Sequence, residues 1–281
     1  MQWNFYLSGI LYGKFYVKDN DIFVEKLDAA KGIWYPKETF TEESDDFFKK
    51  LCSRSLLDFF KNKKEYEEKI SEGADEFTAS SGETFSNRRN EVYFQRQKKF
   101  PKDLFYDEDG IYAVLMSGRD FAAVLVKNGE EDRTILSRWK KAFPEPPAAV
   151  NFLGTFFVDT RDGEKLATDV YLPKGEAYKE QKVPSVLIRT PYGKGERTEQ
   201  YYRFVQRGYA VVIQDTRGRE DSTGEWLPNY YEVEDGDDTL NWIADQKWSD
   251  GQVSMTGGSY LGYVQWSAAA SGNPHLKAIL S

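Results

Sequence analysis

A serine flanked by glycines is the group in this 281-residue sequence that is best placed to do chemistry. It is Ser259, in the stretch TGGSYLGY at residues 256–263. The apolar segment before it, GQVSMTGG, predicts a strand, and the small-residue segment after it, YLGYVQWSAAAS, predicts a helix. A serine between a strand and a helix is the arrangement that a nucleophile elbow requires, since a sharp turn lifts the hydroxyl above the edge of the sheet.

The residues next to Ser259 fit the same interpretation. Gly257, Gly258 and Gly262 relieve crowding in the turn, although the spacing is G-x-S-Y-x-G and not the strict G-x-S-x-G, because position 261 is leucine. A helix that begins at Tyr260 would point its first N–H groups at the serine, where they can bind a developing oxyanion. The octapeptide alone equally fits a glycine-rich turn in any doubly wound fold.

A serine nucleophile needs a base, and the sequence has one histidine, His275. A helix over the segment after Ser259 would carry the chain about 18 Å away, at 1.5 Å per residue. His275 then falls at the opposite edge of the sheet. We therefore expect a structural role for His275, and we expect that the base is not in this chain.

The elements around Ser259 predict an open α/β sheet wound with helices on both faces. FLGTFFVDT and KLATDVYLP read as a hairpin joined by RDGE, and PSVLIRT, YAVVIQDT and LKAILS read as apolar strands. EQYYRFVQRG reads as a helix that ends on Gly208, and VEDGDDTLNWIADQ reads as a helix with carboxylates in its first turn.

The first half of the chain, residues 1–143, predicts a separate α+β domain of unknown role. WNFYLSGILYGKFYV and DIFVEKL read as strands joined by KDND, and EVYFQ, DLFYD, GIYAVLMS and FAAVLVKN read as further strands. Apolar residues at three- and four-residue steps predict one helix over residues 41–70, with Thr39 and Glu42 as a possible capping box. Cys52 lies on its apolar face and is expected to be a buried bystander. The prolines in FPEPPAAV predict a linker over residues 144–150, which leaves residues 151–281 as the second domain.

Composition limits the partners. The formal net charge is −8 with no basic stripe, which argues against nucleic acid and against an anionic membrane surface. No long apolar run and no basic leader occur, so the default expectation is a cytoplasmic protein. A single cysteine excludes an internal disulfide framework.

The second half closely resembles the α/β-hydrolase domain of the cocaine-esterase and X-Pro dipeptidyl-peptidase-like family, often labelled CocE/NonD hydrolases. An ordered series of motifs carries the resemblance over residues 151–281. They are DTRDGEKLATDVYLP, LIRTPYGKG, RGYAVVIQDTRGREDSTGEW and EDGDDTLNWIADQKWSDGQVSMTGGSYLGYVQWSAAASGNPHLKAI.

The resemblance implies three site residues. Ser259 matches the family's nucleophile, the backbone N–H of Tyr260 matches one oxyanion-hole donor, and Tyr192 in TPYGK matches the tyrosine whose hydroxyl is the other donor. Tyr192 follows a predicted strand, near the position from which hydrolases usually send their second donor. In QDTRGREDSTGEW the matching positions are Asp215, Arg217, Gly218 and Asp221, and there we expect a structural arginine–carboxylate clamp on the loop.

The resemblance also implies an activity and an incomplete domain. The expected function is a serine hydrolase that cleaves acyl esters or X-Pro peptide bonds through an acyl-enzyme, without a cofactor or metal, on a small-molecule ester or a short peptide. The sheet is expected to be truncated after about six strands, without the triad acid and base, so that this chain alone is nearly inactive. The alternative is a catalytically inactive fragment or an interaction protein, and homo-oligomers are possible. Dehalogenase-type chemistry would want a carboxylate in place of Ser259.

Overall fold

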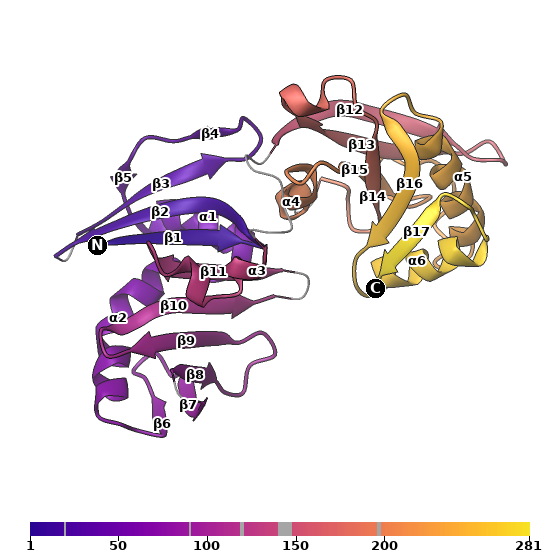
Figure 1. The fold of residues 1–281 in the computed structure, drawn as a ribbon. Helices are drawn as coiled ribbons and strands as arrows, with labels where there is room; N and C mark the ends of the chain where they lie inside the picture. Colours follow the sequence, from indigo (N-terminus) through magenta and orange to yellow (C-terminus); the bar gives the residue numbers. More distant parts are fainter. Residues whose placement is uncertain (20, 90, 119–120, 140–147, 196–197) are drawn as a thin grey trace. The chain divides into compact units, whose positions relative to one another are not determined.

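The chain folds into two compact units, which we describe separately (Figure 1). In the computed structural model, the residues described are 1–19, 21–89, 91–118, 121–139, 148–195 and 198–281. The N-terminal unit comprises residues 1–28 and 33–144, and the C-terminal unit comprises residues 29–32 and 145–281. Most of the predicted proline linker, residues 144–147, lies outside the described residues, and regular structure resumes with a strand at Ala149.

The N-terminal unit is built on one eleven-stranded antiparallel sheet, in the order β4-β3-β2-β1-β11-β10-β9-β8-β7-β6, with β5 paired to β3. Its strands are β1 (Gln2–Leu7), β2 (Ile10–Lys18), β3 (Asp21–Asp28), β4 (Ile33–Trp34), β5 (Glu38–Thr39), β6 (Glu76–Thr78), β7 (Thr84–Arg89), β8 (Val92–Gln95), β9 (Lys102–Asp107), β10 (Gly110–Ser117) and β11 (Ala122–Lys127). Its helices are α1 (Glu42–Cys52), α2 (Leu56–Ser71), the 3₁₀ turn η1 (Glu131–Arg133) and α3 (Leu136–Trp139).

The first predicted strand is in fact a hairpin. Ser8 and Gly9 both have positive φ, 48° and 89°, and they connect β1 to β2. Two successive residues with positive φ make the kind of tight turn that suits the twist of an antiparallel pair. The prediction of one continuous strand was wrong because the Ser-Gly pair was not recognised as a turn signal.

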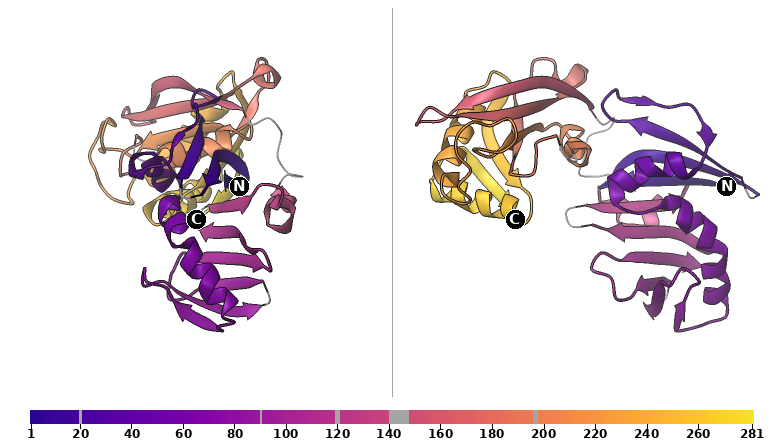
Figure 2. Two further views of the ribbon diagram at one scale, coloured as in Figure 1. Left: turned by 90° about the vertical axis from the view of Figure 1, so that its left-hand side faces the viewer. Right: turned by 180° about the vertical axis from the view of Figure 1, so that it is seen from behind.

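The single helix predicted over residues 41–70 is two helices. Ser53 ends α1 in a left-handed conformation with φ 54°, and Ser55 caps the start of α2 by accepting a hydrogen bond from the Asp58 N–H at 2.9 Å. The capping box of α1 is formed by Thr41 and Ser44, and not by Thr39 and Glu42. The apolar periodicity continues across the break, because both helices pack against the same face of the sheet (Figure 2).

Aromatic rings form the core between these helices and the sheet. Phe48 of α1 packs against Phe5 and Phe15 at centroid distances of 5.2 and 5.0 Å, and Phe59 of α2 packs against Trp3 at 5.8 Å. Cys52 is buried in the same helix pair, and burial raises the pKa of its thiol to about 12, so this thiol is unreactive near neutral pH.

The C-terminal unit is built on a six-stranded mixed sheet in the order β12-β13-β15-β14-β16-β17. Its strands are β12 (Ala149–Asp159), β13 (Lys165–Lys174), β14 (Val183–Thr190), β15 (Ala210–Asp215), β16 (Ser249–Thr256) and β17 (Leu276–Leu280). The first two strands form an antiparallel hairpin, and the last four are parallel. The connecting elements are the 3₁₀ turns η2 (Glu176–Tyr178) and η3 (Thr198–Tyr201) and the helices α4 (Tyr202–Val205), α5 (Glu232–Ala244) and α6 (Tyr260–Ala270).

This sheet is covered on both faces, as the continuous apolar strands predict. Val186 and Ile188 of β14 join one core cluster with α4, whereas Leu187 between them joins another with α5 and α6. Successive side chains of a strand point to opposite faces, so one apolar strand can supply two cores. The helix predicted to end on Gly208 is shorter than expected, since only η3 and the single turn of α4 form before Gly208 turns the chain with φ 91°.

Within the described ranges, none of the helices has the length and apolar character needed to cross a bilayer.

Candidate active site

Ser259 occupies a strained turn between β16 and α6. Its backbone has φ 63° and ψ −125°, an unfavourable conformation for a residue with a side chain, and the residue is exposed. Its carbonyl accepts the first helical hydrogen bonds, from the N–H groups of Gly262 at 2.9 Å and Tyr263 at 3.1 Å. This is the backbone geometry that the sequence predicts for a nucleophile elbow, whereas the catalytic role of Ser259 stays a prediction.

Gly257 makes the turn sterically possible. Its φ of 133° lies where side chains are rarely tolerated, and a Cβ added there would come within 2.6 Å of the Leu261 Cβ. The start of the helix therefore packs directly over the backbone of Gly257. Only glycine allows the strand end and the helix start to approach this closely.

A buried glutamine ties the elbow to the neighbouring strand. Gln265 of α6 is fully buried, and its Nε2 donates to the carbonyls of Gly257 and Leu261 at 2.8 and 2.9 Å. Its Oε1 accepts from the N–H of Leu280 in β17 at 2.9 Å. The sequence analysis missed this residue, and the available signal was a glutamine among small apolar residues in a predicted helix.

Tyr260 follows Ser259 as the first residue of α6, so its N–H has no acceptor within the helix and is free to face a ligand. Its phenol hydroxyl accepts from the N–H of Asn229 at 3.2 Å and donates to Glu232 Oε1 at 2.7 Å. Burial, and then the hydrogen bond to this carboxylate, raise the pKa of Tyr260 above its ordinary value. Glu232 in turn pairs with the fully buried guanidinium of Arg189 at 2.6 Å.

Arg189 and Glu232 were also missed by the sequence analysis. An arginine inside the apolar strand PSVLIRT was the signal, because a charged residue that points into a core must be paired there. Arg189 Nε also donates to Gln214 Oε1 at 2.8 Å, so this buried group links β14, β15 and the start of α5 beneath the elbow.

Tyr192 lies in the loop that follows β14. Because β14 and β16 are adjacent and parallel, Tyr192 and Ser259 leave the sheet at the same carboxyl edge. The Tyr192 side chain is 58% exposed, and its hydroxyl makes no hydrogen bond to any residue that the structure describes. The structure thus places the two residues at one edge of the sheet, and among the described residues no hydrogen bond joins them.

The predicted arginine–carboxylate clamp has different partners from those in its own motif. Arg217 pairs with Asp162, through Nη1 at 2.6 Å and Nη2 at 2.9 Å, and with the buried Asp235 at 2.5 Å. Asp215 and Asp221 instead hold Lys194, from the loop of Tyr192. The motif is therefore anchored by two separate clusters, both at the carboxyl edge of the sheet.

His275 lies at the other end of β16. Its Nδ1 is 2.9 Å from the carbonyl oxygen of Gly251, near the start of that strand. The strand from Gly251 to Thr256 covers about 17 Å at 3.3 Å per residue. This separates His275 from the turn of Ser259, as the sequence analysis expects.

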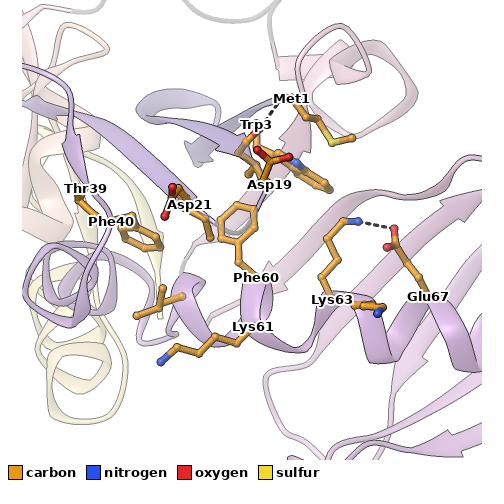
Figure 3. Close-up of a pocket in the computed structure, with 14 residues that line it drawn as sticks. Met1, Trp3, Asp19, Asp21, Thr39, Phe40, Phe60, Lys61, Lys63 and Glu67 are labelled. Atoms are coloured by element: carbon orange, nitrogen blue, oxygen red, sulfur yellow. Dashed lines mark hydrogen bonds and ion pairs between the residues drawn. The ribbon is translucent and has the colours of Figure 1, made fainter.

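The N-terminal unit has a groove of about 740 Å³ (Figure 3). It lies between α2 and the end of the β2–β3 hairpin, with Trp3, Phe40 and Phe60 among its lining residues. Its lysines already have partners, since Lys61 pairs with Glu42 at 2.8 Å and Lys63 pairs with Glu67 at 2.6 Å. No cluster of three or more His, Cys, Asp or Glu side chains arranged for a metal ion is found among the described residues.

A mixed sheet with a strained serine turn and a helix N-terminus beside it is the arrangement expected of an α/β-hydrolase. Comparison with known families agrees. Residues 162–281 match the family model described as X-Pro dipeptidyl-peptidase (S15 family).

The same region is similar in sequence to proteins named as esterases. It is 47% identical over 128 residues to cocaine esterase of Rhodococcus sp. (strain MB1 Bresler), an alignment that covers 43% of this chain and 22% of that protein. The chain therefore spans about a fifth of the length of this relative.

Solved structures give partial matches. One is an aminopeptidase from a marine sediment Thaumarchaeota archaeon, with 28% identity, a TM-score of 0.42, and coverage of 46% of this chain and 25% of that one. Another is a CocE/NonD family hydrolase from Staphylococcus aureus, with 27% identity, a TM-score of 0.41, and coverage of 48% of this chain and 30% of that one.

Proposed function

We propose that Ser259 is the nucleophile of a serine hydrolase that cleaves acyl esters or X-Pro peptide bonds through an acyl-enzyme. The observation that carries the proposal is the strained, exposed turn of Ser259 at the carboxyl edge of the parallel strands of the mixed sheet. Strain of this kind persists where a hydroxyl has to project from the fold. The homologous region of cocaine esterase supports an esterase or a related hydrolase.

The groups around Ser259 suit acyl transfer. Ser259 Oγ would attack the carbonyl carbon, and the carbonyl oxygen would gain a negative charge as the C–O bond to serine forms. The free N–H of Tyr260 and the hydroxyl of Tyr192 are the proposed donors to that oxyanion. Loss of the leaving group would give the acyl-enzyme, and water would then hydrolyse it by the same steps.

The proton of Ser259 needs an acceptor for this attack to be fast. His275 does not provide it, because it lies at the opposite end of β16. Within the described part of the chain, no side chain hydrogen-bonds to Ser259 Oγ. We therefore expect the 281 residues alone to react slowly, since an unactivated serine hydroxyl is a weak nucleophile near neutral pH.

Phosphonylation by a fluorophosphonate tests the proposal. Ser259 Oγ forms a bond to phosphorus, the P–F bond breaks, fluoride leaves, and the serine proton passes to a base. We expect slow labelling that intact-mass and peptide analysis place on Ser259, and an increase in rate when imidazole is added as an external base. Ser259→Ala should abolish the adduct, and Ser254→Ala should not.

Two other labelling results would change the proposal. No adduct at Ser259 at high imidazole would reject the nucleophile assignment and favour a chain that acts only through binding. Rapid labelling without imidazole that Ser259→Ala removes would support the nucleophile, but it would show that the chain holds a base we have not identified.

A further inference from the structure

Lys194 is a buried lysine two residues after Tyr192. It is 8% exposed, although it lies in a loop at the edge of the sheet. Burial of an ammonium group is costly unless partners compensate for the lost water. The partners of Lys194 therefore show what this lysine is placed to do.

Two carboxylates hold Lys194. Its Nζ lies 3.1 Å from Asp215 Oδ2 and also contacts Asp221 Oδ2, and its backbone N–H donates to Asp215 Oδ1 at 2.6 Å. Asp215 is fully buried and is the last residue of β15, which pairs in parallel with β14. One lysine thus joins the loop after β14 to the loop after β15 through both its side chain and its backbone.

The lysine stays charged in this position. Burial alone would lower the pKa of Lys194, but hydrogen bonds to Asp221 and Asp215 outweigh it, and the pKa is raised. A protonated lysine with its hydrogens directed at two carboxylates cannot accept the proton of Ser259. Its role is to hold the loop in place.

The other contacts of the loop converge on the same short segment. Arg219 Nε donates to the carbonyl of Pro191 at 2.9 Å, and the N–H of Tyr192 donates to Thr190 Oγ1 at 3.1 Å. The Tyr192 phenol has no hydrogen bond of its own within the described ranges. These contacts fix the backbone from which the Tyr192 side chain projects, so they determine the region that its hydroxyl can reach.

We infer that Lys194 is the positioning residue for Tyr192, and that its ion pairs with Asp215 and Asp221 hold the Tyr192 hydroxyl where an oxyanion would form. This inference rests on the proposed function, because it takes Tyr192 as an oxyanion donor. In this role Lys194 acts through its ion pairs with Asp215 and Asp221 and not through contact with the substrate or with Ser259.

Hydrogen exchange of the Tyr192 amide in the full chain tests the positioning directly and does not depend on any reaction. Lys194→Met should accelerate this exchange by at least about tenfold, since the loop loses its anchor. Lys194→Arg, which keeps the charge, should restore much of the protection. Lys165→Met is the control, because among the described residues the Lys165 ammonium pairs with the exposed Asp159, at 2.5 Å, and its loss should leave Tyr192 unchanged.

Phosphonylation of Ser259 in the presence of imidazole tests the consequence. We expect Tyr192→Phe to slow labelling by about 100-fold, as is typical for one oxyanion donor, and Lys194→Met to slow it by at least about tenfold. The double variant should be no slower than Tyr192→Phe alone, because Lys194 acts only through that hydroxyl.

Two results would overturn the inference. One is unchanged exchange at Tyr192 in a folded Lys194→Met protein. The other is a double variant whose losses multiply, which would mean that Lys194 acts elsewhere. If Lys194→Met does not fold, Asp221→Asn replaces it, since the Asp221 side chain is 67% exposed and its loss strands no buried charge. If Ser259 is unreactive in the unaltered protein, the proposed function fails, and the exchange measurement still decides the positioning.

Discussion

At the scale of single residues, the sequence predicts the residues of the candidate site but not the buried polar residues that support them. Ser259, Tyr260 and Tyr192 were predicted as site residues from a glycine-flanked serine and from the motif around TPYGK, and their roles stay predictions. Arg189, Lys194 and Gln265 were not, because what identifies them is burial, and burial of a polar residue depends on contacts between distant elements. Asp215 illustrates this, since it was assigned to an arginine clamp and in fact binds a lysine 21 positions earlier in the chain.

The buried ion pair beneath the elbow leads to a prediction about stability. Glu232→Gln should lower the free energy of unfolding by about 3–5 kcal/mol, because it leaves the buried Arg189 charge without its closest partner. Glu234→Gln is the control, since Glu234 lies in the same first turn of α5 and is exposed. Urea unfolding measures the free energy of unfolding of both variants. Equal small decreases in the two variants would contradict a stabilising role of the Glu232–Arg189 pair.

The Arg217 clamp predicts a pH dependence. The Arg217 guanidinium, and then the Thr160 hydroxyl, hold the pKa of Asp162 well below its ordinary value of 3.8. Because the pKa of Asp162 is lower in the folded state than in the unfolded state, its ionised carboxylate stabilises the fold at pH values above 3.8. This stabilisation is lost as the pH falls below 3.8 toward the folded-state pKa. Because Asp162 is half exposed, the effect should be at most about 1 kcal/mol.

The measurement is thermal unfolding of the unaltered protein and of Asp162→Asn. The unaltered protein should be the more stable at pH 6, and the difference should shrink as the pH falls from about 4 toward the acid limit of folding. A difference that grows on acidification would contradict the assignment.

At the scale of elements, apolar patterns predicted the type of most segments and failed at their ends. The four strands from β8 to β11 and the helices α5 and α6 were predicted from the pattern of residue types along each segment, and the structure confirms them. The hairpin at Ser8–Gly9 and the break at Ser53 were missed, because a left-handed residue interrupts the backbone without interrupting the apolar stripe. Helix and strand ends depend on single backbone conformations, which periodicity does not report.

The elbow itself can be tested as an element. Gly257→Ala should destabilise the protein by about 1–3 kcal/mol, since alanine is strained at this φ and its Cβ meets Leu261. Gly175→Ala is the control, because Gly175 has an extended backbone with φ 164° and an added Cβ would lie 3.7 Å from Tyr178 Cδ2, an ordinary van der Waals contact. Circular dichroism during urea unfolding gives both values, and an unaffected Gly257→Ala protein would argue against a tightly packed turn.

At the scale of the whole molecule, the chain divides its core between two units. The N-terminal unit has an aromatic core around Phe48, and the C-terminal unit has separate apolar clusters on the two faces of its own sheet. The mixed helix and strand content of residues 1–143 could be predicted, but the single eleven-stranded sheet could not, since pairing order is a long-range property.

Separate cores predict separate consequences of mutation. Phe48→Ala should destabilise the N-terminal unit by about 3–5 kcal/mol and leave the rate of Ser259 phosphonylation unchanged at a temperature where the protein stays folded. Phe47→Ala on the same helix should cost less, because Phe47 is only partly buried. A Ser259 rate that falls together with the stability of the N-terminal unit would show that the two units act as one.

The most direct test of the central claim is a crystal structure of the phosphonylated protein. The account predicts phosphorus bonded to Ser259 Oγ, with the phosphonyl oxygen about 3 Å from both the Tyr260 nitrogen and the Tyr192 hydroxyl. An adduct on another residue, or a phosphonyl oxygen that neither group contacts, would contradict it.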